Sequence, residues 1–326
     1  MVSFPLITVV LTTYNRSHLI GETLDSIIGQ TYENWKCIII DDNSKDNTKE
    51  VVLNYLEKDN RFQYYLKGNK YVKGLSASRN MGMDLIESLK LNTKYIQFFD
   101  DDDIMHPQKF EIQVKEFTKY KKLDASFFIG KSFYNNDFNY NIEYYSSVDS
   151  TLVNDIAKYF FIKKYFFTAQ VLLIRYNTII DKRFNEELFY AEEWEFFNKL
   201  FFLKKVNISF IENTPLFYHR KHNLSITSNL YNDANNIVLK SLKKSFRNVY
   251  KLIKEVGRLN DSEIFYKLLT HAIYHDGSML EDLRNDLKLG TLQNKYKERG
   301  VVFLLKNISF NKKIISRLIG AVLIKI

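Results

Sequence analysis

The first hundred residues alternate between short apolar runs and segments with a helical apolar stripe. This alternation limits the fold more than any other feature of the chain. The largely apolar runs predict buried strands over Leu6–Leu11, Trp35–Ile40, Phe62–Leu66 and Lys94–Phe99. Between them, the apolar spacing predicts helices over His18–Ile28, Asn47–Leu56 and Gly74–Leu89. Strands that alternate with helices in this way predict an α/β fold, with a mostly parallel sheet flanked by helices.

Polar residues gather where three of these strands end. Thr12–Arg16 follows the first strand, Asp41–Ser44 the second and Asp100–Asp103 the fourth. The carboxyl ends of strands form the ligand crevice of such a sheet, so we expect the three clusters to lie together. The first turn has no G-x-G-x-x-G and the chain has no P-loop. A Rossmann dehydrogenase is therefore disfavoured, and phosphate binding through a carboxylate-held metal is favoured.

Asp100–Asp103 is a run of consecutive carboxylates that admits two interpretations. Two unit charges about 4 Å apart repel by about 1 kcal/mol in water and about 4 kcal/mol at an effective dielectric of 20. The run is therefore either well solvated or a site for a cation. Acidic residues before a helix also favour its N-terminal dipole, and Pro107 suits a first helical turn. The run alone does not separate a metal role from this structural one.

Composition narrows the class of protein. The chain has 326 residues, 45% of them hydrophobic, enough for one large domain or two smaller ones. Its single cysteine, Cys37, excludes internal disulfides and fits a reducing compartment. The sequence shows no secretory signal and no apolar run of about 20 residues, which predicts a cytoplasmic protein. The net charge of +9 suits several anionic partners, but no nucleic-acid recognition motif is present.

The later part of the chain predicts further elements and then changes character. Helices are expected over Lys109–Tyr120 and Tyr190–Leu203. The further predicted strands are Ala125–Ile129, Phe166–Ile174, Val206–Ile211 and Pro215–Tyr218. From about Tyr231 the pattern is mainly helical and basic. The basic, apolar end, Lys312–Ile326, is too short to span a bilayer. It suits either a helix at a membrane interface or one packed on the protein itself.

Five motifs, in this order, resemble those of the family 2 glycosyltransferases. They are Val9–Arg16 (VVLTTYNR), Ser26–Tyr32 (SIIGQTY), Ile39–Ser44 (IIDDNS), Gly74–Gly82 (GLSASRNMG), and Phe99–Asp103 (FDDDD) with Pro107. The resemblance covers about the first two thirds of the chain and implies a GT-A fold. It indicates a catalytic domain over residues 1–225, with nucleotide-sugar binding in 1–105 and acceptor binding in 106–225. Residues 226–326 would form a helical, basic region that contacts a membrane or a partner.

The same resemblance implies an inverting transfer from a nucleotide-diphosphate sugar, a UDP-sugar, with Mn²⁺ or Mg²⁺ as cofactor. The donor-binding residues carried over by position are Thr12, Tyr14, Arg16, Asp42, Arg79, Asp100 and Asp101. Thr12 and Tyr14 would line the nucleobase pocket, and Asp42 would accept a hydrogen bond from the base. Arg79 would lie near the base or the diphosphate, and Asp100 and Asp101 would reach the ribose and the donor sugar.

Asp102 is the implied metal ligand, and Asp103 keeps a structural role before the helix that Pro107 opens. Hard divalent cations prefer carboxylate and phosphate oxygens, which agrees with this assignment. His222 matches a histidine found in many family members after the base helix. The resemblance implies that His222 ligates the metal or touches the diphosphate, with Arg220 or Lys221 nearby.

An inverting transfer needs a base that takes the proton of the acceptor hydroxyl. Family members carry Glu-Asp before an aromatic residue at the start of a helix, and here the sequence is Glu192-Glu193-Trp194. Glu193 therefore takes the catalytic position, one methylene longer than the usual Asp. The residues leave two alternatives open, because Glu192 also fits the role and both acids suit a helix N-terminus.

These features predict an enzyme, a glycosyltransferase in bacterial surface polysaccharide or glycoconjugate synthesis. Its partners would be a nucleotide-sugar donor and a glycan or lipid-linked acceptor, and nucleic acid is not expected. Residues 312–326 would make peripheral contact with the inner face of the membrane. The alternative is a non-catalytic nucleotide-sugar-binding module on the same fold. The acids at Asp42, Asp100, Asp102 and Glu193 argue against that alternative.

Overall fold

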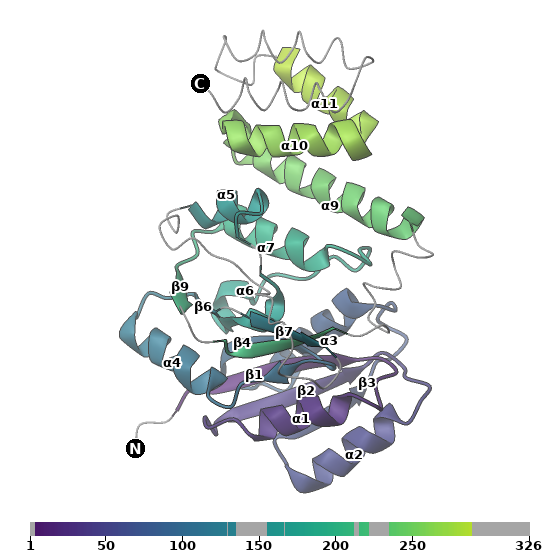
Figure 1. Ribbon diagram of the computed structural model, residues 1–326, viewed down its shortest axis with the longest axis vertical. Coiled ribbons are helices and arrows are strands. Elements are labelled where there is room, and N and C mark those ends of the chain that lie inside the picture. The colour runs from purple at the N-terminus through teal and green to yellow at the C-terminus, as the bar shows by residue number, and fades with distance from the viewer. Residues whose placement is uncertain are drawn as a thin grey trace.

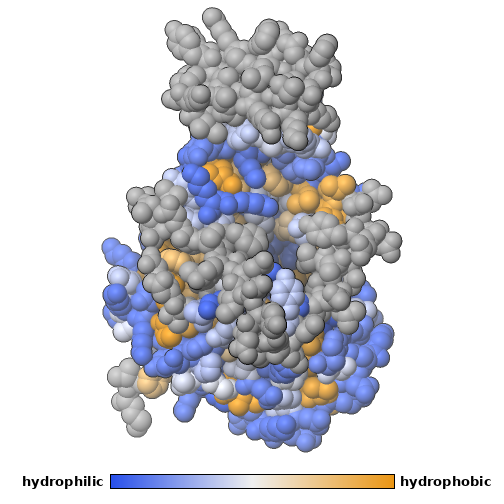
Figure 2. Space-filling model, viewed as in Figure 1, coloured by the Kyte–Doolittle hydropathy of each residue, from blue (hydrophilic) through white to orange (hydrophobic). Residues whose placement is uncertain are grey.

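Figure 1 shows the computed structural model of the chain. The structure describes residues 4–128, 130–134, 155–165, 167–211, 215–221 and 235–288. In Figure 1 an α/β layer structure lies below, and helices from the last third of the chain stack above it. On the face shown in Figure 2, hydrophilic residues cover most of the described α/β surface, and apolar residues form small separate patches.

A sheet of seven strands in the order β3-β2-β1-β4-β8-β6-β9 forms the centre of the α/β part. Its first four strands are parallel: β1 (Leu6–Thr13), β2 (Trp35–Asp41), β3 (Phe62–Leu66) and β4 (Thr93–Asp100). The helices between them are α1 (Ile20–Ile28), α2 (Thr48–Lys58) and α3 (Leu75–Ser88). All seven predicted elements of this region are confirmed, and the predicted ends differ from the observed ones by two residues at most.

The helices cover both faces of the sheet, as the alternating pattern predicts. In Figure 1, α1 and α2 lie together on one side and α3 lies on the other. Gly82 allows α3 to approach β1 closely, because a Cβ at that position would lie 2.3 Å from Cγ1 of Val10. The strand interiors are apolar and buried, since both faces of the sheet are covered.

The second half of the sheet departs from the parallel arrangement. β8 (Leu172–Arg175) is antiparallel to β4 and to β6 (Ala125–Phe128), and β6 is parallel to β9 (Ile208–Ile211). The helices of this region are α4 (Lys109–Lys119), α5 (Ile156–Phe161), α6 (Tyr176–Ile179) and α7 (Glu192–Leu203). The small second sheet contains β5 (Ile104–Met105), β10 (Phe217–Lys221) and β7 (Gly130–Tyr134).

The predicted strand Phe166–Ile174 is wrong in its first part. A short 3₁₀ helix, η2 (Ala169–Val171), precedes β8 there, and Phe166 lies outside the described residues. The carbonyl oxygens of Ala169 and Gln170 accept hydrogen bonds from the buried Gln97 side chain at 3.2 and 3.0 Å. Because these carbonyls bond to a side chain, the turn satisfies them without a strand partner. Apolar periodicity does not reveal such a partner.

The helices after residue 235 build a second hydrophobic core on α7. They are α9 (Asn235–Glu255), η3 (Arg258–Asn260), α10 (Ser262–His275) and α11 (Gly277–Lys288). Trp194 of α7 stacks on Phe246 of α9 with ring centroids 4.5 Å apart, and it also packs against the main core. The predicted boundary at residue 225 and the segment Lys312–Ile326 lie outside the described residues, so both stay predictions. Of the described helices, none combines the length and apolar character needed to cross a membrane.

Candidate active site

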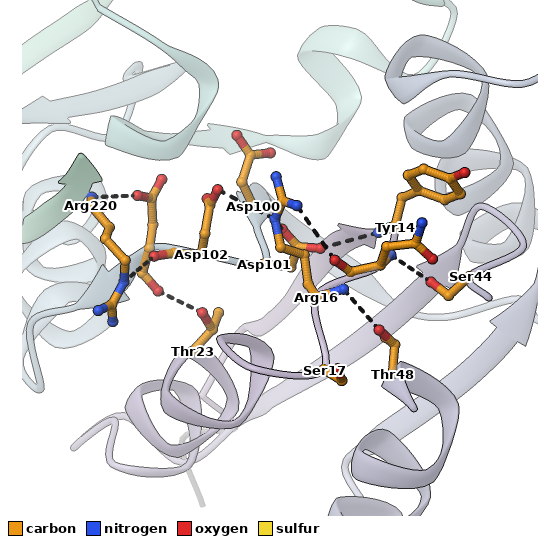
Figure 3. Close-up of polar contacts among 12 residues, drawn as sticks. Tyr14, Arg16, Ser17, Thr23, Ser44, Thr48, Asp100, Asp101, Asp102 and Arg220 are labelled. Carbon is orange, nitrogen blue, oxygen red and sulfur yellow. Dashed lines mark hydrogen bonds and ion pairs between the residues drawn. The ribbon is translucent and has the colours of Figure 1, made fainter. Parts of the chain in front are cut away.

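The three polar clusters lie together at the carboxyl edge of the sheet, as predicted (Figure 3). The backbone N–H of Tyr14 donates to Asp101 Oδ2 at 3.2 Å, which joins the ends of β1 and β4. The N–H of Asn15 donates to Ser44 Oγ at 2.9 Å, which joins the ends of β1 and β2. Asn15 has a left-handed φ of 53°, a conformation that Asn tolerates better than most residues. Hydrogen bonds therefore connect the ends of β1, β2 and β4 at this edge.

A cavity of about 230 Å³ opens at this edge beside β2 and β3. It is lined by Tyr14, Asp42, Asn43, Lys45, Lys67, Gly68, Asn69, Tyr71 and Lys73. The Tyr14 hydroxyl is 3.1 Å from Lys73 Nζ, which also lies over the Tyr14 ring at 4.4 Å. Thr12 is buried within β1, where it pairs with Asp100 of β4 and Ile40 of β2. Of the predicted donor-binding residues, Tyr14 and Asp42 thus line the cavity.

Arg16 faces the aspartate run from the β1 turn. Its Nε is 3.5 Å from Asp101 Oδ1 and 3.8 Å from Asp102 Oδ2. The backbone N–H of Arg16 donates to Thr48 Oγ1 at 2.8 Å, so the start of α2 fixes the turn. Burial raises the pKa of Asp101 well above its usual range, and the charge of Asp102 adds to the rise. The Arg16 guanidinium acts in the opposite direction.

Asp103 is buried and makes structural contacts with β10 and α1. Its Oδ1 accepts the backbone N–H of Arg220 on β10 at 2.9 Å, and its carbonyl accepts the Thr23 hydroxyl at 2.9 Å. Arg220 Nε donates to the Asp102 carbonyl at 3.0 Å, and its Nη2 lies 2.6 Å from Glu22 Oε2. The prediction placed Asp103 at the approach to the Pro107 helix. The observed contacts tie the run to β10 and α1, which only the tertiary fold brings near.

Arg79 is fully buried on α3 and gathers three carboxylates. Its Nη2 is 2.6 Å from Glu193 Oε1 and 3.1 Å from Asp100 Oδ1, and its Nη1 is 3.8 Å from Glu192 Oε1. Burial lowers the pKa of Arg79, but the three carboxylates outweigh it and raise the pKa overall. The predicted contact of Arg79 with the base or diphosphate stays a prediction. Its observed contacts link the end of β4 to the start of α7.

The η2 turn holds two of these carboxylates from the other side. The backbone N–H of Ala169 donates to Glu193 Oε2 at 3.0 Å. The side chain of the next residue, Gln170, donates from Nε2 to Asp100 Oδ2. Glu193 is therefore fixed by Arg79 and by a backbone N–H. Sequence reasoning missed Ala169 and Gln170, because their segment carries no motif.

Burial raises the pKa of two carboxyl groups around Arg79. The pKa of Glu192 rises to about 7, with Arg79 opposing the rise and the charge of Glu193 adding to it. The pKa of Asp100 rises to about 6, and there too burial is the main cause and Arg79 opposes it. A general base works best with a pKa near the working pH, so the raised pKa of Glu192 suits this chemistry.

The donor set suits a divalent cation that also binds substrate phosphates. Within the described ranges, no three His, Cys, Asp or Glu side chains form a metal site by themselves. A Mg²⁺ ion bound with a diphosphate typically needs only one or two protein carboxylates. Asp101 and Asp102 offer carboxylate oxygens at the crevice edge, the hard ligands that such ions prefer. His222, the other predicted ligand, lies outside the described residues.

Sequence comparison finds relatives among glycosyltransferases. A segment is 33% identical over 114 residues to the UDP-Glc:alpha-D-GlcNAc-diphosphoundecaprenol beta-1,3-glucosyltransferase WfgD of Escherichia coli, covering 35% of this chain and 42% of that protein. Another is 35% identical over 99 residues to the GalNAc(5)-diNAcBac-PP-undecaprenol beta-1,3-glucosyltransferase of Campylobacter jejuni, covering 30% of each. The chain thus matches less than half of the length of these curated relatives.

The fold is shared with solved glycosyltransferase structures. A 1–349 fragment of S. aureus TarS in complex with UDP-GlcNAc superposes with a TM-score of 0.66 at 15% identity, over 98% of this chain and 91% of that one. The mannosyltransferase PcManGT from Pyrobaculum calidifontis, in complex with GDP-Man and Mn²⁺, gives a TM-score of 0.55 at 13% identity, over 99% and 87%. At such identities the likeness shows the fold, and the predicted GT-A architecture is confirmed.

A family model described as Glycosyl transferase family 2 matches residues 8–189, more than half of the chain. The match contains the strand-end clusters, Arg79 and the η2 turn, but it ends before Glu192. The predicted family and the predicted enzyme class are both confirmed. The protein belongs to glycosyl transferase family 2 and is a glycosyltransferase.

Proposed function

We propose that this enzyme moves a sugar from a UDP-sugar, with inversion, to a lipid-linked or glycan acceptor in polysaccharide synthesis. Two relatives carry names that state a diphosphoundecaprenol or PP-undecaprenol acceptor, and one of these names also states UDP-Glc as the donor. Each match spans only part of the relative, so donor and acceptor remain proposals for this chain. The donor sugar itself is left open.

One observation carries the proposal: the Tyr14 N–H bonds to Asp101 at 3.2 Å while the Tyr14 side chain lines the cavity. Because Tyr14 both lines the pocket of about 230 Å³ and bonds to Asp101, the pocket lies next to the aspartate run. A pocket lined by Asp42 suits a nucleobase, and the neighbouring carboxylates suit the metal–diphosphate part of the donor. The carboxyl edge of the sheet thus offers one surface for the nucleobase of a nucleotide-diphosphate sugar and a second for its diphosphate.

Asp102 would hold Mn²⁺ or Mg²⁺ together with the donor diphosphate, and His222 is the second ligand in this proposal. When bound, the ion would neutralise the charge that develops on the leaving diphosphate. Arg16 adds positive charge beside Asp101 and Asp102 on the same side of the crevice. Asp100 and Asp101 would contact the ribose and the donor sugar, and Arg79 would hold Asp100 in place.

Glu193 is the proposed catalytic base. Its carboxylate takes the proton of the acceptor hydroxyl while that oxygen attacks the anomeric carbon. The bond from the anomeric carbon to the diphosphate oxygen breaks, and UDP leaves. Arg79 and the Ala169 N–H fix the orientation of Glu193, and such positioning lowers the barrier of the transfer.

Glu192 is the alternative base because of its raised pKa. The variants Glu193→Gln and Glu192→Gln separate the two roles. The base variant should lose about 10²–10⁴-fold in turnover while its affinity for UDP changes little. If Glu193→Gln kept full transfer activity, the assignment of Glu193 would be wrong.

UDP-sugars, each with and without Mn²⁺, test the donor directly. A ligand that binds the folded state raises the melting temperature by mass action, so a UDP-sugar should do so more strongly with Mn²⁺. The same samples are then assayed for release of UDP. Loss of both effects for every UDP-sugar, with a GDP-sugar or CDP-sugar active instead, would contradict the UDP part of the proposal.

The proposed place of action is the cytoplasmic face of the membrane, where residues 312–326 would lie at the interface. The supporting facts are the printed lipid-linked acceptors of the two relatives and the basic, apolar sequence of this segment. Flotation with anionic vesicles tests it. Binding should fall with salt and should be lost when residues 312–326 are deleted, and unchanged flotation of the shortened chain would refute it.

A further inference from the structure

Lys67 is a buried lysine at the end of β3 to which the sequence motifs assign no role. It is 2% exposed, and its Nζ is 2.5 Å from Asp42 Oδ1. Nζ also lies 3.0 Å from Ser78 Oγ and 3.2 Å from the carbonyl of Gly74. Lys67 thus donates hydrogen bonds to Ser78 and Gly74, and its charge faces Asp42 in an ion pair. Lys67 also lines the cavity, and its shortest contact there is the ion pair with Asp42.

Asp42 is held from a second side by the loop before α3. Its Oδ2 accepts the backbone N–H of Gly74 at 2.8 Å. Gly74 has a φ of +127°, a conformation that favours glycine, so the residue type supports this N–H in its position. Asp42 is 8% exposed and lines the cavity. Each carboxylate oxygen has a further lone pair, which leaves Asp42 able to accept a hydrogen bond from a ligand.

The ammonium of Lys67 supplies a counter-charge 2.5 Å from the Asp42 carboxylate. A buried carboxylate without a counter-charge favours its protonated form, and a neighbouring cation favours the ionised form. The protonated carboxyl would donate through O–H, whereas the carboxylate accepts only. Uracil presents a ring N–H between two carbonyls, and cytosine presents a bare ring nitrogen at the same position. An acceptor-only group matches the first and leaves the second without a donor.

We propose that Lys67 sets the nucleobase selectivity of this enzyme by holding Asp42 as an anionic acceptor that takes uracil and rejects cytosine. Lys67 is then a positioning residue for the donor, because it acts through its ion pair with Asp42. This inference rests on the proposed function, because it explains how the proposed UDP site reads its base. It adds a specificity determinant that lies outside the three strand-end clusters.

Binding of UDP and CDP to the full chain, by calorimetry with Mn²⁺, tests the proposal. The two ligands share ribose and diphosphate, so the ratio of their dissociation constants reports on the base alone. The wild type should bind UDP about 10–100-fold more tightly than CDP, as expected for one hydrogen bond to a charged group. In Lys67→Met, UDP should weaken by at least about tenfold and the UDP-to-CDP preference should fall towards one.

Two further variants serve as controls. Lys67→Arg keeps the positive charge and should retain most of the preference for UDP. Lys45→Met removes an exposed lysine of the same cavity. It should weaken both nucleotides alike, so the ratio should not change. A ratio that falls equally in Lys45→Met would show that general positive charge, and not the contact with Asp42, produces the selectivity.

A double variant keeps the test decisive if Lys67→Met unfolds. Lys67→Met combined with Asp42→Asn removes both buried charges, and its amide offers a donor and an acceptor. It should bind UDP and CDP with similar affinity. If the wild type prefers UDP and either Lys67→Met or the double variant keeps that preference, this inference is wrong. The proposed UDP donor is not affected by that result. A wild type that binds neither nucleotide overturns the proposed UDP donor as well.

Discussion

The substitution Arg79→Met removes the cation on which three carboxylates converge. The guanidinium is fully buried, with carboxylate oxygens at 2.6, 3.1 and 3.8 Å. Breaking a buried ion pair by removing one partner costs about 3–5 kcal/mol, because an uncompensated buried charge remains. Since three carboxylates lose their counter-charge here, we expect a loss of about 4–5 kcal/mol at neutral pH.

Urea unfolding at pH 7 measures this loss, with Arg61→Met as the matched control. Arg61 forms a 2.6 Å pair with Asp59, but the Arg61 side chain is 28% exposed. Pairs near the surface contribute about 0–1 kcal/mol, so the control should stay close to the wild type. Folded domains are stable by about 5–15 kcal/mol, so Arg79→Met should remain folded but with a clearly lower midpoint.

A second substitution separates the loss of charge balance from a simple loss of packing. Adding Glu193→Gln to Arg79→Met removes one of the unpaired carboxylates, and it should restore at least about 1 kcal/mol. A simple packing defect would show no such coupling. If Arg79→Met lost no more stability than Arg61→Met, the assignment of Arg79 as the central cation of the site would be wrong.

Three other predictions use independent features. Because burial raises the pKa of Glu192 from 4.5 to about 7, its protonated form stabilises the fold below about pH 4.5, and this contribution is lost as pH rises to about 7. The unfolding free energy of the wild type minus that of Glu192→Gln should therefore fall over this interval, and a flat or rising difference would contradict it. Gly82→Ala should destabilise by about 1–3 kcal/mol in urea unfolding, since the new Cβ would lie 2.3 Å from Val10. Gly277→Ala meets nothing within 4 Å and should stay within about 0.5 kcal/mol. Asp102→Asn should reduce the gain in UDP affinity that Mn²⁺ gives by at least about tenfold in calorimetry, and an unchanged gain would exclude Asp102 as the metal ligand.

The sheet and its crevice could be predicted from the sequence because they depend on local patterns. The strand β2 is the apolar run Trp35–Ile40 with one residue added, and α3 is the stripe over Gly74–Leu89 without its first and last residues. Each run is short, bounded by polar residues and long enough to show its period. The meeting of the strand ends then follows from the parallel arrangement, without knowledge of any contact.

The contacts inside the site could not be predicted, because they join residues far apart in the sequence. From the sequence, Arg79 is only a cation on a predicted helix. Its partners on α7 lie more than 100 residues later, and only the tertiary fold brings them close. Lys67 looks like an ordinary residue after a strand, and its burial appears only when the Gly74 loop folds over it. Ala169 lies in a run that resembles a strand, because the buried Gln97 that bonds its carbonyl is 72 residues away.

The aspartate run illustrates how a fold accommodates adjacent negative charges without leaving them in bulk water. Asp100 bonds to Arg79 and Gln170, whereas Asp101 contacts Arg16 and the Tyr14 N–H. Asp103 turns the other way and accepts the backbone N–H of β10. Asp100 and Asp103 thus have separate partners, whereas Asp101 and Asp102 both face Arg16 Nε, at 3.5 and 3.8 Å. These contacts oppose the repulsion between adjacent carboxylates. The run is therefore a junction of three separate contacts, and a substitution at any one of its positions should affect a different property of the enzyme.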